Sequence, residues 1–133
     1  MRGKTLTRVQ PNGDKQVVAQ LAGGPNGAAI GPDGRCYIWQ QRRIRFHEGR
    51  LSDAPWACPA RLRGGWIEAV DLKTGQSEVI HRTCGDIQLR GPNDLVFDQH
   101  GGFWFTDHGK IMARQRDRGA VFYASIDGSS SGR

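Results

Sequence analysis

Four polar residues flank two short runs of β-forming residues in the last third of the chain: Asn93, Asp94, Asp107 and His108. The runs occupy residues 95–97 and 103–105, and a turn with two glycines separates them. Such a pattern predicts a β-hairpin. Because a hairpin places the start of its first strand beside the end of its second, we expect these polar residues at one end of the sheet, where chemistry would occur.

Each of these residues has a chemical interpretation and a structural alternative. The amide oxygen of Asn93 is a hard donor for calcium or a substrate hydroxyl, or it caps the turn before the strand. Asp94 would orient Asn93 or a metal-bound water, or it serves as a turn residue. Asp107 and His108 suit proton transfer, although neighbours on a strand point to opposite faces.

The same pattern occurs earlier in the chain. Residues 24–39 parallel residues 91–106 without a gap, so that the two Gly-Pro-Asn triplets coincide. Asn26 therefore occupies the position of Asn93 and is a second candidate for metal or substrate binding. The dipeptide Asn26-Gly27 is also a favourable turn sequence, which leaves a structural role open.

A second type of hairpin alternates with the first. Its turns lie at Asn12-Gly13, Thr74-Gly75 and Asp127-Gly128, each between apolar runs. One hairpin of each type makes four antiparallel strands, which is typical of a β-propeller blade. The alternative is a meander or sandwich of unrelated hairpins, and the repeated triplets argue against it.

We therefore predict one all-β region over residues 1–133, a partial β-propeller of about two to two and a half blades. Residues 1–22 would form the outer strands of one blade. Residues 23–84 would form a full blade with a long loop at 40–64, and residues 85–133 most of the next. Tyr37, Trp104 and Phe105 are expected between blades, and His47, His81 and His100 in solvated loops or turns.

The composition of the chain bears on its binding partners and on its cellular compartment. The net charge of +6 invites nucleic-acid binding. The arginines, however, are scattered over segments expected to be loops, so we predict a solvated basic surface and no nucleic-acid partner. No apolar run is long enough to span a membrane, and no secretory signal is visible. The widely spaced Cys36, Cys58 and Cys84 then predict free thiols in the cytoplasm.

The two Gly-Pro-Asn segments, together with Gly101-Gly102-Phe103-Trp104-Phe105-Thr106-Asp107, resemble the senescence-marker-protein/gluconolactonase/luciferin-regenerating-enzyme family. The resemblance covers nearly the whole chain. It implies a six-bladed propeller that hydrolyses lactones and related esters. It also implies one divalent cation, such as calcium or zinc, in the central channel.

In that family a Glu of the first blade and Asn and Asp residues of later blades hold the cation. Asn93 matches one such position, with Asn26 as a second candidate. The matching Glu-Gly-Pro segment would precede Thr5, and further ligand segments would follow Arg133; neither is present in this sequence. The resemblance therefore implies a fragment of a metal-dependent hydrolase of small lactones or sugar-derived esters.

The alternative is a non-catalytic partial propeller, acting as a binding module or arising as a truncated gene product. In either case we expect the isolated chain to bind metal weakly and to be inactive, because calcium affinity depends on the number and charge of the ligands. Open blade edges would also favour self-association.

Overall fold

The computed structural model describes residues 4–41, 64–110 and 116–132, and in these ranges it contains strands and no helix. None of the described segments thus forms an apolar helix of membrane-spanning length. The strands are β1 (Thr5–Val9), β2 (Lys15–Gln20), β3 (Gly24–Ile30), β4 (Cys36–Gln41), β5 (Gly65–Val70), β6 (Ser77–His81), β7 (Thr83–Cys84), β8 (Ile87–Gln88), β9 (Pro92–Phe97), β10 (Gly102–Asp107), β11 (Ala120–Ser125) and β12 (Ser131–Gly132).

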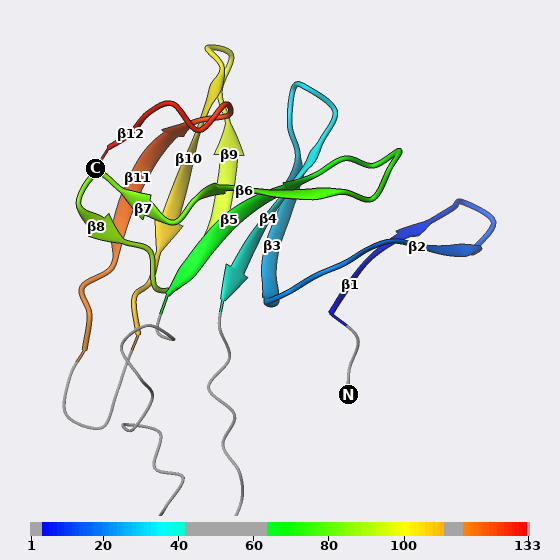
Figure 1. The fold of residues 1–133 in the computed structure, drawn as a ribbon, viewed down its shortest axis with the longest axis horizontal. Coiled ribbons are helices and arrows are strands. Elements are labelled where there is room, and N and C mark those ends of the chain that lie inside the picture. The colour runs from blue at the N-terminus through cyan, green and yellow to red at the C-terminus, as the bar shows by residue number, and fades with distance from the viewer. Residues whose placement is uncertain (1–3, 42–63, 111–115, 133) are drawn as a thin grey trace, which may run out of the picture.

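The strands form antiparallel sheets. Strands β1 and β2 form an N-terminal hairpin, β3-β4-β5-β6 a central sheet, and β12-β11-β10-β9 a C-terminal sheet. Strands β7 and β8 form a small separate hairpin that the sequence did not predict. Figure 1 shows the N-terminal hairpin, the central sheet and the C-terminal sheet following one another across the molecule. The all-β prediction is confirmed. Most of the loop predicted at 40–64 lies outside the described residues.

The main core lies between the central and C-terminal sheets. Its buried members are Tyr37, Trp39, Ile67, Ala69, Cys84, Leu89, Phe103, Phe105, Phe122 and Ala124. The Phe103 ring is fully buried and meets the rings of Tyr37 and Trp39 at centroid distances of 5.9 and 5.5 Å. Burial of these aromatic rings provides most of the free energy that holds the two sheets together.

The opposite face of the central sheet packs on the N-terminal hairpin. Cys36, Ile38 and Val70 of the sheet are buried with Ala19 and Leu21. Because side chains alternate along a strand, the two inner strands of the central sheet, β4 and β5, supply residues to both cores. The central sheet is thus the middle layer of three.

The β9–β10 turn shows how local sequence builds the hairpin. Gly101 has a φ of 89°, which favours glycine. The Asp98 carboxylate accepts hydrogen bonds from the backbone N–H groups of His100 and Gly102 at 2.8 and 3.0 Å. These bonds fix the turn and with it the register of β9 on β10.

Two side chains are placed differently from the sequence expectation. Trp104 was expected in the core, but it is 49% exposed because it points away from Phe103 and Phe105 on the alternating strand. His81 was expected to be solvated, but it is buried at the end of β6, where its Nε2 lies 2.9 Å from the carbonyl oxygen of Ser125. Tyr37 and Phe105 are buried as expected.

Candidate functional site

Strands β3 and β9 lie against each other, although they belong to different sheets. Figure 1 shows them as neighbours at the centre of the molecule. The contact requires a glycine, since a Cβ atom added at Gly27 would collide with the carbonyl oxygen of Asn93. Gly27 thus permits close approach of two backbones, and its φ is not in the left-handed region.

This contact brings Asn26 and Asn93 together. The Nδ2 of Asn26 donates to Oδ1 of Asn93 and lies 3.5 Å from the carbonyl oxygen of Pro92. Asn26 is exposed and Asn93 is half-buried. Two amide side chains from equivalent positions of the repeat therefore meet at one surface site, and their roles there stay predictions.

A second polar pair adjoins the asparagines. The Nε2 of Gln41 donates to the same Pro92 carbonyl at 3.0 Å, and Nζ of Lys110 donates to Oε1 of Gln41 at 2.9 Å. Burial lowers the pKa of the Lys110 ammonium and outweighs the opposite effect of Asp107 and Asp117. The sequence analysis missed this pair, because no local pattern links a strand end at residue 41 to one at residue 110.

Asp107 is a buried backbone acceptor. Its Oδ1 accepts hydrogen bonds from the N–H groups of Gly91 and Gly109 at 2.8 and 2.7 Å. Its Oδ2 accepts one from the N–H of Arg90 at 2.8 Å. His108 directly follows the end of β10 and is exposed. This geometry favours a structural role for Asp107 in holding the segment before β9, and it does not pair Asp107 with His108.

Asp94 also lies apart from the asparagine pair. Its Oδ1 accepts a hydrogen bond from the N–H of the next residue, Leu95, at 2.9 Å. Its own N–H donates to Oγ1 of Thr106 at 3.4 Å. Asn93 and Asp94 lie where the register of β9 on β10 shifts, between the pairs Phe105–Leu95 and Asp107–Pro92. The predicted supporting contact from Asp94 to Asn93 has no counterpart among the hydrogen bonds of the described residues.

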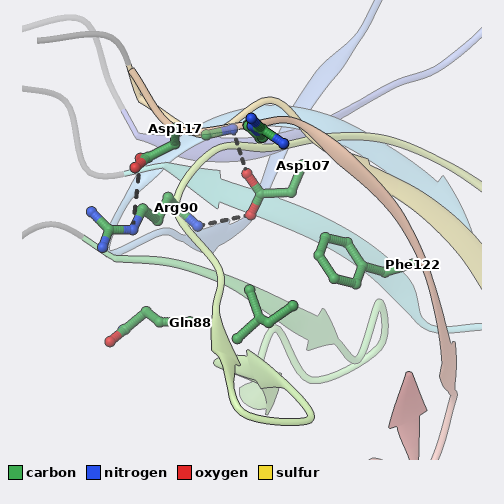
Figure 2. Close-up of a pocket in the computed structure, with 8 residues that line it drawn as sticks. Gln88, Arg90, Asp107, Asp117 and Phe122 are labelled. Carbon is green, nitrogen blue, oxygen red and sulfur yellow. Dashed lines mark hydrogen bonds and ion pairs between the residues drawn. The ribbon is translucent and has the colours of Figure 1, made fainter. Parts of the chain in front are cut away.

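A pocket of about 190 Å³ lies beside Asp107. Figure 2 shows Arg90 and Asp117 pointing toward each other at its wall, and their Nε and Oδ2 atoms are 3.6 Å apart. Other lining residues are Gln88, Arg118 and Phe122. Neither asparagine of the candidate site lines this pocket. Its two carboxylates already accept backbone hydrogen bonds, from residues 90, 91 and 109 and from Lys110.

The donor set at the asparagine pair does not fit a complete divalent-cation site. Asn26 and Asn93 provide neutral amide groups, and Oδ1 of Asn93 is already an acceptor. Within residues 4–41, 64–110 and 116–132, no cluster of three or more His, Cys, Asp or Glu side chains is arranged to hold a metal. A tight calcium or zinc site would need carboxylate or imidazole ligands beyond this pair.

Comparison with known proteins identifies the family. A family model described as the SMP-30/gluconolactonase/LRE-like region matches residues 1–132, whereas a search of curated proteins gave no match. Proteins of this family are six-bladed propellers, include lactonases and commonly bind a divalent metal. Because the match extends over nearly the whole sequence, this chain belongs to the SMP-30/gluconolactonase/LRE-like family.

Proposed function

We propose that this chain forms part of a metal-dependent lactone or ester hydrolase, with Asn26 and Asn93 at the substrate site. The convergence of the two amides from neighbouring strands β3 and β9 carries the proposal. An amide oxygen accepts a hydrogen bond from a sugar hydroxyl, and an amide NH₂ donates one to a carbonyl oxygen. Asn93 is in addition the position that matches a cation ligand of the family.

The same proposal covers the arrangement of the sheets as propeller blades. The central and C-terminal sheets would be neighbouring blades of a six-bladed propeller, and the N-terminal hairpin the outer half of a third. Two observations support this: both sheets have the strand order of a four-stranded meander, and they pack face to face through a continuous aromatic core. In this arrangement β3 and β9 are the innermost strands, next to the channel.

A non-catalytic binding module is the second candidate function. It is favoured by one observation: the asparagine pair has no metal-binding cluster of acidic, histidine or cysteine side chains among the described residues. The pair would then recognise a hydroxyl-rich ligand without turning it over. Both candidate functions place the bound small molecule on Asn26 and Asn93. They differ in whether that molecule is hydrolysed once the remaining metal-coordinating side chains are supplied.

Side-chain amide resonances provide a direct binding test, because the sequence contains only three asparagines. On titration with D-glucono-δ-lactone and gluconate, the NH₂ signals of Asn26 and Asn93 should shift. The signals of Asn12 should not, because it lies in the exposed β1–β2 turn. Asn93→Ala should abolish the response, and Asn12→Ala should leave it intact. An unchanged pair of signals at millimolar ligand would refute ligand binding there.

Metal binding and turnover are tested separately. Calorimetric titration of the isolated chain with Ca²⁺ and Zn²⁺ should give weak or no binding, and lactone hydrolysis should not exceed the spontaneous rate. Sub-micromolar cation affinity would show that the chain completes the metal site by itself. Metal-dependent hydrolysis that Asn93→Ala removes would favour the enzyme over the binding module.

A further inference from the structure

A half-buried ammonium group adjoins the asparagine pair. The Nζ atom of Lys110 donates a hydrogen bond to Oε1 of Gln41 at 2.9 Å, and Nε2 of Gln41 donates to the carbonyl oxygen of Pro92 at 3.0 Å. Nδ2 of Asn26 lies 3.5 Å from the same carbonyl oxygen and donates to Oδ1 of Asn93. The side chains of Lys110, Gln41, Asn26 and Asn93 thus form one continuous row, which we call the polar strip.

The polar strip lies where the two larger sheets meet. Asn26 is on β3 and Gln41 ends β4 in the central sheet, whereas Asn93 is on β9 and Lys110 follows β10. Strand β9 contacts both β3 and β4. The position of Lys110 beside the amides therefore follows from contacts between two sheets that share the main core.

The Lys110 ammonium has little in its surroundings to balance its charge. An ammonium group has three N–H donors, and within residues 4–41, 64–110 and 116–132 its one acceptor is the neutral amide oxygen of Gln41. In the same ranges Lys110 forms no ion pair. Burial lowers the pKa of Lys110, because it removes water from the charged group. A bound anion would supply both an acceptor and the opposite charge.

Two carboxylates act on the Lys110 charge from a distance, those of Asp107 and Asp117. Both oxygens of Asp107 accept hydrogen bonds from backbone N–H groups. Oδ2 of Asp117 accepts the backbone N–H of Lys110 at 3.0 Å and lies 3.6 Å from Nε of Arg90 (Figure 2). Since neither carboxylate bonds to Nζ, the ammonium keeps donors for a ligand as far as the described residues are concerned.

We propose that Lys110 selects ligands that carry a carboxylate. This inference rests on the proposed function, because it requires a small hydroxylated molecule on Asn26 and Asn93. The two amides hydrogen-bond to hydroxyl and carbonyl groups of the ligand, and the ammonium forms a charge-assisted hydrogen bond with a carboxylate at its other end. Only the Gln41 amide separates the ammonium from the asparagines, so a sugar-sized ligand reaches both. The substrate class is thereby narrowed to acidic lactones, such as the monolactone of a sugar diacid.

Two lactones that differ at a single carbon test this selection. D-Glucaro-1,4-lactone carries a carboxylate where D-glucono-1,4-lactone carries a neutral CH₂OH group. Titrations of the full chain, followed by the side-chain NH₂ resonances of Asn26 and Asn93, give a dissociation constant for each lactone. The acidic lactone should bind tighter by about tenfold or more, as expected for one hydrogen bond to a charged group. It alone should shift the Cε–H resonances of Lys110, one of four lysines in the chain.

Substitutions separate the effect of Lys110 from that of other cations. Lys110→Gln should bring the two dissociation constants together, and Lys110→Arg should keep them apart, because arginine also donates to a carboxylate. Lys73→Gln is the matched control, since Lys73 is exposed in the β5–β6 turn and lies outside the polar strip; it should bind both lactones like the original chain. The comparison of the two lactones on the original chain needs no variant, so it decides the matter even if a substitution impairs folding.

The possible failures are distinguishable. Equal affinities of the original chain for the two lactones overturn the selection by Lys110 but leave the asparagine site intact, because both lactones then shift its resonances. A preference for the acidic lactone that persists in Lys110→Gln also overturns it, because another cation is then responsible. If neither lactone shifts the resonances of Asn26 and Asn93, the proposed function fails, and the role of Lys110 fails with it.

Discussion

Asp107→Asn separates a structural from a catalytic role at the end of β10. The substitution keeps the size of the side chain and replaces one carboxylate oxygen with an NH₂ donor. The remaining oxygen can still accept from the N–H groups of Gly91 and Gly109. The new NH₂ group then faces the N–H of Arg90, which now bonds to Oδ2 at 2.8 Å. One charge-assisted hydrogen bond is lost, and two donors oppose each other.

The free-energy cost follows from the burial of the site. Asp107 is only 6% exposed, so water does not readily replace the lost acceptor. A hydrogen bond to a charged group contributes about 1.5–3 kcal/mol, and a buried donor left unsatisfied has a similar cost. Because Arg90 is only part-buried, we expect a total loss of about 2–3 kcal/mol. For a domain of this size, that loss lowers the thermal midpoint by roughly 5–10 °C.

Urea unfolding followed by tryptophan fluorescence and by circular dichroism would measure this loss. Asp86→Asn is the control, because Asp86 is exposed in the β7–β8 turn and should change the free energy of unfolding by less than about 0.5 kcal/mol. If Asp107→Asn unfolds at the same urea concentration as the original chain, the structural argument is refuted. The interpretation of Asp107 as a proton-transfer residue would then regain support.

Three further substitutions probe the rest of the fold. Gly27→Ala should cost about 1–3 kcal/mol through its clash with the Asn93 carbonyl, and should shift the amide resonances of the asparagine pair. Hydrogen bonding, led by the N–H of Ser129, lowers the pKa of Asp127 from 3.8 to about 2. The charged carboxylate of Asp127 therefore stabilises the fold fully above about pH 4 and less as the pH falls toward 2. Asp127→Asn removes this contribution, so the urea midpoint of the variant should depend less on pH between these values. Phe103→Ala should cost about 3–5 kcal/mol, because a fully buried ring leaves a cavity between the sheets.

Two of these substitutions have a control in the chain. Gly132→Ala meets no atom within 4 Å and should be nearly neutral; equal losses at both glycines would contradict the close-approach argument. Val96→Ala, on an exposed face, should cost far less than Phe103→Ala, and comparable values would mean that the core is misidentified. If Asp127→Asn leaves the fall of the urea midpoint between pH 4 and pH 2 unchanged, the loss of stability at low pH comes from other carboxylates.

The sequence determined the local structure. Side-chain alternation with period two and Asn-Gly, Thr-Gly and Asp-Gly turns placed the hairpins, because these features depend only on neighbours along the chain. Glycines at 13, 75, 101 and 128 have positive φ, as such turns require. The repeat also aligned Asn26 with Asn93, and the family resemblance proved correct over residues 1–132.

Tertiary structure decided which residues meet. The contact between Asn26 and Asn93 depends on β3 and β9 approaching through Gly27, and no sequence period encodes a contact between separate sheets. In the same way, Nζ of Lys110 donates to Gln41, and the N–H groups of Arg90 and Gly91, in the segment before β9, donate to Asp107. Alternation predicts that a strand has two faces, but only the packed neighbour determines which face is covered. Trp104 is half-exposed for this reason, whereas its equivalent Tyr37 is buried.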